Sequence, residues 1–251
     1  MLLTAALAAA VACYGTISGL GGGILFVPVL LLAGYGMQVA TPMSLAAVFL
    51  ASVAGMLPAP RRALVDVGIF RTVAVAAVLG SLLGGALAQH LPEEPLLLLF
   101  AGVSAVVTVD SLRPDRGRRA GHLGGARRAR LAAGGGAAGL LSGSLGIGGG
   151  VLIVPLVRHL GPLRIERATA TSIAVIVFSS SVGVASNLLA APAAGLSGVP
   201  LELLLAAGLG AISGGWVGGR FSPRVGERAR AALVSFGAAA ATIVALVRLA
   251  A

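Results

Sequence analysis

The chain has 251 residues, of which 57% are hydrophobic, 10% are charged and 38 are glycine, and its formal net charge is +10. Soluble domains carry about 25% charged residues because their surfaces face water, so the composition excludes a soluble enzyme and a soluble nucleic-acid-binding domain. The single cysteine, Cys13, excludes an intrachain disulfide framework. We therefore expect an integral membrane protein whose main partner is the lipid bilayer.

Apolar stretches long enough to cross a bilayer, which takes about 20 residues, follow one another along the whole chain. The first charged residue is Arg61. The pattern predicts an all-α membrane protein with helical spans at residues 2–34 (interrupted), 38–57, 67–90, 95–112, 131–160 (interrupted), 168–189, 201–220 and 229–249. The longest polar connection is short, so no soluble domain is predicted.

An internal repeat is the strongest signal in the sequence, and such repeats are typical of transporters. Residues 19–28 read GLGGGILFVP and residues 146–155 read GIGGGVLIVP, which are identical at seven of ten positions. Two further pairs follow at nearly the same offset: ATPMSLA at 40–46 with ATATSIA at 168–174, and LGSLLGG at 79–85 with LGAISGG at 209–215. The repeat predicts two homologous transmembrane halves, 1–112 and 131–251, joined by a basic cytoplasmic linker, 113–130.

The arginines predict how the two halves are oriented, because basic residues collect in cytoplasmic loops. If each half crossed the membrane four times, seven of the eighteen arginines would lie outside. If the glycine-rich segments 2–34 and 131–160 each enter and leave on one side, every arginine except Arg248 lies on one side. This favours inverted repeats, each with a Gly-interrupted helix plus three transmembrane helices, and with both termini outside. Re-entrant hairpins and pairs of full passes would place the same arginines on each side of the membrane, so the count does not distinguish them.

The two glycine triplets are the first candidate site. A glycine costs about 1 kcal/mol relative to alanine inside a helix, so three in a row require a reason. A helix break near mid-membrane exposes backbone amides and the positive end of the next half-helix, which suits an anion. This reading assigns substrate binding to Gly21, Gly22, Gly23, Gly148, Gly149 and Gly150. The alternative is close helix packing, which we expect at the spacings Gly15/Gly19, Gly80/Gly84 and Gly210/Gly214/Gly218.

Hydroxyl side chains form the second part of the candidate site. Thr41 and Ser44 follow the first glycine motif, and Thr169 and Ser172 follow the second at matching positions. Because a hydroxyl can donate a hydrogen bond to an oxyanion, we expect these four residues to bind substrate. The alternative is that each hydroxyl bonds to its own helix.

Other chemistries find little support. The chain has no lysine, which a P-loop requires, and its histidines fall at span ends or in loops. We predict no enzyme activity, catalytic residue, bound cofactor, metal site or nucleic-acid partner. Coupling to a proton or sodium gradient stays open, with Asp66, Asp110 and Glu202 at span ends as candidate proton carriers.

The repeated motif, GTISGLGGGILFVPVL from Gly15 with ATPMSLA and SGSLGIGGGVLIVPLV from Ser142 with ATATSIA, resembles the TauE/SafE family of membrane permeases, the sulfite exporters. The resemblance covers nearly the whole chain. It implies a plasma-membrane permease for a small anion such as sulfite or a sulfonate. Gly15 and Gly19 are one residue further apart than Gly143 and Gly146, so the two half-sites need not be equivalent. A passive anion channel and a non-transporting sensor or chaperone subunit are the alternatives.

Overall fold

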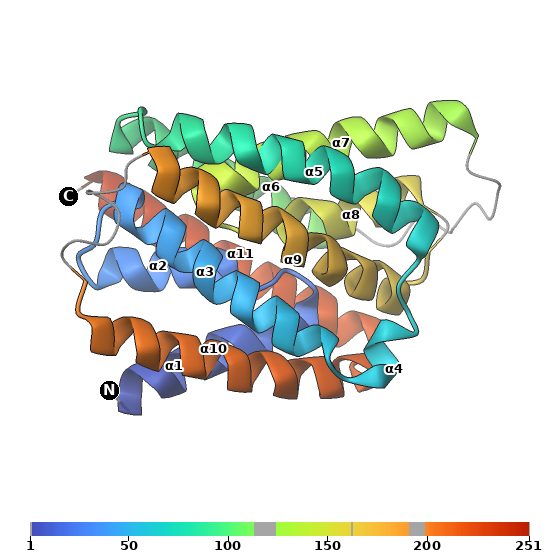
Figure 1. Cartoon of the computed structure of the whole chain (residues 1–251), viewed down its shortest axis with the longest axis horizontal. Helices are drawn as coiled ribbons and strands as arrows, with labels where there is room; N and C mark the ends of the chain where they lie inside the picture. Colours follow the sequence, from blue (N-terminus) through green and yellow to red (C-terminus); the bar gives the residue numbers. More distant parts are fainter. Residues whose placement is uncertain (1, 113–123, 162, 191–198, 251) are drawn as a thin grey trace.

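The computed structural model describes residues 2–112, 124–161, 163–190 and 199–250, and every regular element among them is helical (Figure 1). The first half contains α1 (Leu2–Ser18), α2 (Gly23–Leu32), α3 (Met37–Met56), α4 (Ala59–Arg62), α5 (Val67–Ala88) and α6 (Glu93–Leu112). The second half contains α7 (Gly125–Leu145), α8 (Gly150–Leu160), α9 (Ile165–Ala190), α10 (Leu201–Phe221), the short 3₁₀ helix η1 (Ser222–Arg224) and α11 (Glu227–Ala250). The predicted all-α fold is confirmed.

Six described helices, namely α3, α5, α6, α9, α10 and α11, are long and apolar enough to cross a bilayer, with 19–26 residues each. Since about 20 residues suffice to span the hydrocarbon core, the chain is a multi-pass membrane protein. Helices α1, α2 and α8 are apolar but shorter. Helix α7 begins at Gly125, inside the segment that we predicted as a linker. The linker residues 113–123 lie outside the described part of the chain.

The two glycine motifs interrupt two helices that turn back in opposite directions. Figure 1 shows α1 running from the left of the view to the middle of the molecule, where the chain turns and α2 returns to the left. Helix α7 runs inward from the right, and α8 returns to the right. The remaining long helices run the full length of the molecule, so the two broken segments meet near its centre.

Helices from the two halves are interleaved. Helix α5 packs mainly on α7 and α9 of the other half, and α10 packs in the same way on α1 and α3. Two pairs join equivalent helices, α3 with α9 and α6 with α11. Each half therefore covers the broken helix of the other half.

The predicted small-residue seams lie in these interleaved contacts. A Cβ atom added to Gly84 would lie 2.0 Å from the backbone oxygen of Leu140, and one added to Gly214 would lie 2.0 Å from that of Ala9. Helices approach this closely only where neither has a side chain between the backbones. The close-packing interpretation is confirmed for these glycines.

Two carboxylates at helix starts satisfy backbone amides. The Asp66 side chain accepts a hydrogen bond from the Ile69 amide at the start of α5, at 3.0 Å. The Glu93 side chain in α6 accepts one from the Met37 amide at the start of α3, at 3.3 Å. These bonds supply acceptors for amides that have no partner within their own helix.

Candidate functional site

Two breaks in the backbone form the centre of the candidate site. The first break is residues 19–22 and the second is residues 146–149. Three glycines in each have a positive φ, a conformation that costs little only for glycine: Gly19 (85°), Gly21 (78°) and Gly22 (94°), and Gly146 (75°), Gly148 (77°) and Gly149 (72°). The predicted breaks are confirmed, although each begins two residues earlier than expected. Gly19, predicted only as a packing residue, belongs to the first break.

The helix that follows each break starts without a side-chain cap. Gly22 is the N-cap of α2 and Gly149 is the N-cap of α8, and neither N-terminus has a capping side chain. The first amides of an α-helix point away from the helix and carry partial positive charge. Each break therefore places an uncapped, partially positive helix end in the protein interior.

The two breaks touch each other through their backbones. A Cβ atom added to Gly23 would lie 2.5 Å from the carbonyl carbon of Ile147, and one added to Gly150 would lie 2.6 Å from the carbonyl oxygen of Gly19. Leu20 is fully buried and Ile147 almost fully. The third glycine of each triplet is thus required by the opposite break and not by its own conformation.

The recurring serines join each break to the other half of the chain. Ser44 in α3 donates a hydrogen bond to the Gly146 carbonyl at 2.7 Å, and Ser172 in α9 donates one to the Gly19 carbonyl at 3.0 Å. Both serines are buried. In this conformation their hydroxyl protons are bonded to the carbonyl groups of the breaks.

The recurring threonines pack on the same glycines but differ in their polar contacts. A Cβ atom added to Gly146 would lie 2.9 Å from the Cα of Thr41, and one added to Gly19 would lie 2.7 Å from the Cβ of Thr169. The Thr169 hydroxyl donates to the Glu166 carbonyl at 3.0 Å. The Thr41 hydroxyl is buried and has no hydrogen-bond partner among the described residues. All ten predicted site residues therefore lie at or beside the two breaks.

Ser142 is a site residue that sequence comparison of the two halves missed. Its hydroxyl oxygen lies 3.5 Å from the position of a Cβ atom on Gly149, and it is buried without a partner in the described structure. The matching residue of the first half is Gly15, which packs against Gly22. A search for hydroxyls that recur in both halves cannot find a residue present in only one.

Two buried arginines were also missed. Arg61 in α4 and Arg230 in the first turn of α11 are the largest fully buried side chains, with exposed fractions of 1% and 2%. Arg230 donates to the carbonyls of Ile17 at 2.8 Å and Val225 at 3.0 Å, to the Thr169 hydroxyl at 3.1 Å, and to Ser222. In the sequence both residues have the appearance of ordinary loop arginines, since nothing local distinguishes a buried one.

Arg61 has far fewer partners than Arg230. Its Nη2 lies 3.4 Å from the Thr169 carbonyl, while Nε and Nη1 have no hydrogen-bond partner in the described part of the chain. Burial, and to a smaller extent the charge of Arg230, lowers the pKa of Arg61 to about 9. The residue therefore carries its charge at neutral pH in an environment that does not compensate for it.

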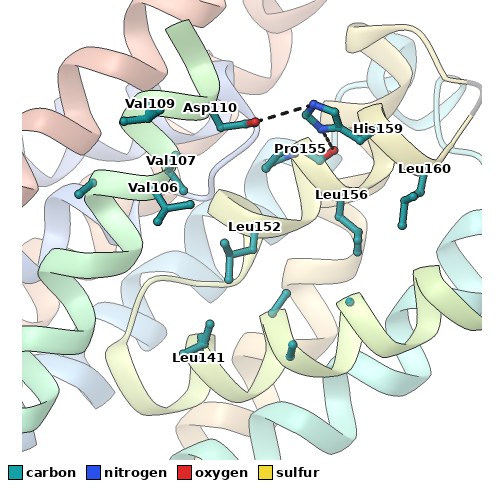
Figure 2. A pocket seen from close by; sticks show the side chains of 14 residues that line it. Val106, Val107, Val109, Asp110, Leu141, Leu152, Pro155, Leu156, His159 and Leu160 are labelled. Atoms are coloured by element: carbon teal, nitrogen blue, oxygen red, sulfur yellow. Dashed lines mark hydrogen bonds and ion pairs between the residues drawn. The ribbon is translucent and has the colours of Figure 1, made fainter. Parts of the chain in front are cut away.

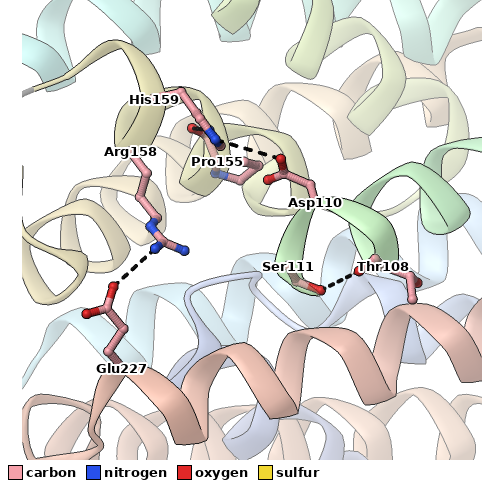
Figure 3. Close-up of polar contacts among 7 residues, drawn as sticks. All are labelled: Thr108, Asp110, Ser111, Pro155, Arg158, His159 and Glu227. Carbon is pink, nitrogen blue, oxygen red and sulfur yellow. Dashed lines mark hydrogen bonds and ion pairs between the residues drawn. The ribbon is translucent and has the colours of Figure 1, made fainter. Parts of the chain in front are cut away.

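An ion pair and a histidine–carboxylate contact join α8 to its neighbours at the end of the molecule that carries Arg61, which we call the basic end. Figure 3 shows Arg158 of α8 paired with Glu227 of α11 at 3.1 Å, and His159 paired with Asp110 of α6 at 3.8 Å. A narrow cavity of about 30 Å³ lies beside them, and Leu20, Val151 and Arg230 contribute to its walls. The cavity extends from Arg158 and Glu227 to Leu20 of the first break and has room for little more than water.

A larger groove of about 720 Å³ lies between α6, α7 and α8. Figure 2 shows its wall of apolar side chains, such as Leu141, Leu152 and Leu156, with Asp110 and His159 at one end. None of the glycines of the breaks lines it. Its chemistry suits acyl chains of the bilayer and not a small anion.

Two of the three carboxylates considered for proton coupling, Asp66 and Asp110, have structural partners. Asp66 caps α5 and pairs with Arg167 at 3.3 Å, and Asp110 pairs with His159. No cluster of metal-ligating side chains occurs in the part of the chain that the structure describes.

Long apolar helices around two facing, glycine-broken segments define a multi-pass membrane protein. The family model for the sulfite exporters, TauE/SafE, matches residues 3–245. The chain therefore belongs to the TauE/SafE family, a family of membrane permeases, as the repeated glycine motif indicated. No curated protein and no solved structure matches the chain.

Proposed function

We propose that the protein is a secondary transporter that moves a small oxyanion, such as sulfite or a sulfonate, across the plasma membrane. The contact between the two breaks carries this proposal. Each break brings an uncapped helix N-terminus into the protein interior beside buried hydroxyls, and such helix ends favour anions. The family is one of sulfite exporters, which agrees with an anion as substrate.

We infer that the two halves are inverted repeats, each with a re-entrant hairpin. The opposite directions of the α1–α2 and α7–α8 hairpins in Figure 1 support this topology. The arginine distribution supports it too, because the basic end collects Arg61, Arg158, Arg164, Arg224 and Arg230, whereas Arg248 ends α11 at the opposite side. By the positive-inside rule the basic end is cytoplasmic.

The topology is tested by single cysteines placed at Arg164, Arg224 and Arg248 in a Cys13→Ala background. All three positions are exposed. In intact cells an impermeant thiol reagent should label the cysteine at position 248 and leave the other two unlabelled. Labelling at position 164 or 224 would contradict the inverted arrangement.

Alternating access in this arrangement requires the basic end to open and close. Here the breaks are buried and the cavity that reaches Leu20 of the first break from the basic end is too small for an oxyanion, so the conformation is closed there. The pairs Arg158–Glu227 and His159–Asp110 join α8 to α11 and α6. We propose that both pairs separate when the cytoplasmic side opens.

The substrate is tested by counterflow into proteoliposomes with sulfite, sulfoacetate, thiosulfate, acetate and sulfate. Saturable exchange of one or two of these anions is the expected result. Uphill flux driven by an imposed proton or sodium gradient would identify the coupling ion. Flux that only runs downhill and never saturates would favour a passive channel, and no exchange of any anion would contradict transport.

A further inference from the structure

Several N–H donors of the buried Arg61 guanidinium have no hydrogen-bond acceptor among the described residues. A guanidinium has five N–H donors, and those on Nε and Nη1 of Arg61 are buried with no partner among the described residues. Its one hydrogen bond, to the Thr169 carbonyl, is long at 3.4 Å. An unpaired buried charge is among the most unfavourable features that a protein interior can contain.

A second positive charge lies at the same threonine. Arg230 donates to the Thr169 hydroxyl at 3.1 Å while Arg61 faces the carbonyl of the same residue. The ion pairs described in the structure include neither arginine. Glu166 attracts Arg230 electrostatically, but it forms no ion pair with it. Two like charges thus share one buried site without an ion-pair partner among the described residues.

The two arginines differ in their hydrogen bonds, which give Arg230 a structural role and leave Arg61 able to bind a ligand. Arg230 is saturated by carbonyl and hydroxyl acceptors from α1, α9 and η1, so it joins these elements. Arg61 is held by no comparable set of bonds and keeps its donors available. Thr169, between them, packs on Gly19 of the first break.

We propose that Arg61 and Arg230 form a buried binding site for a small oxyanion, with Arg61 as the principal ligand and Arg230 as a fixed second charge. Oxyanions match this site because guanidinium groups donate several hydrogen bonds to carboxylate-like and phosphate-like oxygens. Its place at the basic end, beside the Thr169 that packs on Gly19 of the first break, makes it the cytoplasmic binding step of transport, and this assignment of a step rests on the proposed function. Anion binding by Arg61 and Arg230 does not rest on the proposed function.

Binding is measured on the full chain in nanodiscs by calorimetry with sulfite and with sulfate, in a buffer whose only other anion is gluconate. The variant Arg61→Met removes the charge and keeps much of the side-chain volume, and Arg62→Met is its matched control because Arg62 is exposed. Loss of charge-assisted hydrogen bonds should raise the Kd of Arg61→Met by about 10- to 100-fold. Arg62→Met should bind like the wild type.

Thermal unfolding without added anion distinguishes a binding role from a structural one. Removal of an uncompensated buried charge should leave the melting temperature of Arg61→Met unchanged or higher, and the anion should no longer raise it. A lower melting temperature together with unchanged anion affinity would overturn the proposal. So would a wild-type protein that binds neither anion.

A third variant covers the case in which Arg61→Met fails to fold. Arg61→Lys keeps the charge but offers a single ammonium donor group, and its anion affinity should fall below that of the wild type. Affinity equal to wild type in this variant would overturn the role of Arg61. If the wild type binds sulfite and Arg61→Met does not, yet proteoliposomes show no exchange, the site stands and the proposed transport function fails.

Discussion

The two breaks are nearly identical in backbone, yet their surroundings differ. Thr41 packs on the second break and Thr169 on the first, each against a glycine with positive φ. The Thr169 hydroxyl accepts from Arg230, whereas the Thr41 hydroxyl has no partner in the described structure. The duplicated motif therefore fixes the shape of both breaks, and residues outside the motif place positive charge beside only one.

At the opposite end of the molecule a hydrogen bond joins neutral side chains of the two halves. There Gln89 donates to the Asn187 side chain at 2.8 Å, and Asn187 donates to the Gly143 carbonyl at 3.0 Å. Both groups are neutral amides. Changes to the shared backbone should therefore act equally on the two halves, and changes to the flanking side chains should not.

The largest effect is expected at Arg230. Arg230→Met removes charge-assisted hydrogen bonds to the carbonyls of Ile17, Val225 and Ser222, and a hydrogen bond to a charged group contributes about 1.5–3 kcal/mol. We expect stability in detergent to fall by at least about 3 kcal/mol. Arg228→Met is the control, because Arg228 is exposed on the same helix. Equal melting temperatures for the two variants would contradict the structural role of Arg230.

The contact between the breaks should be sensitive from either side. Gly23→Ala and Gly150→Ala each place a methyl group within 2.6 Å of the opposite backbone. Each should lower stability by about 1–3 kcal/mol, as overpacking does, and reduce exchange in counterflow. The comparison depends on the two losses being similar. A large loss for one and none for the other would show that the breaks are not equivalent.

The threonines should respond unequally. Thr169→Val removes an acceptor from a charged donor and should cost about 1–3 kcal/mol. Thr41→Val removes a buried hydroxyl that has no partner and should leave the melting temperature unchanged or slightly raised. If the Thr41 hydroxyl binds substrate, the same variant should lose exchange activity without losing stability. Equal destabilisation by both substitutions would remove the asymmetry described above.

The smallest effect is expected at the surface of the basic end. Glu227→Gln breaks the ion pair with Arg158. The Glu227 side chain is 43% exposed and the Arg158 side chain is 23% exposed. Partly exposed pairs contribute about 0–1 kcal/mol, so stability should hardly change. If the pair keeps the basic end closed, the rate of counterflow should change instead. Glu202→Gln is the control, because Glu202 is exposed at the start of α10.

Much of the fold could be predicted from the sequence, because apolar length and glycine pattern are local properties. The six long helices were predicted close to their observed bounds. The breaks were found because three consecutive glycines are unfavourable inside a helix. The start of α7 was predicted too late, since Arg127, Arg128 and Arg130 were assigned to a loop although they extend the helix beyond its apolar part.

The site was predictable only where the two halves repeat each other. Ser44 and Ser172 were found by recurrence, but their bonds to carbonyls of the opposite break depend on packing between halves. The burial of Arg61 depends on residues more than 100 positions away, such as Thr169. No local pattern separates such an arginine from Arg62, its exposed neighbour.

The contact between Gly23 and Ile147, and its counterpart between Gly150 and Leu20, joins two hairpins through bare main chain. Interdigitated side chains resist sliding, because each must leave one rotamer and enter another before the surfaces can shift. Two glycine surfaces present no rotamers to exchange. The two hairpins therefore meet across a contact that offers little resistance to sliding.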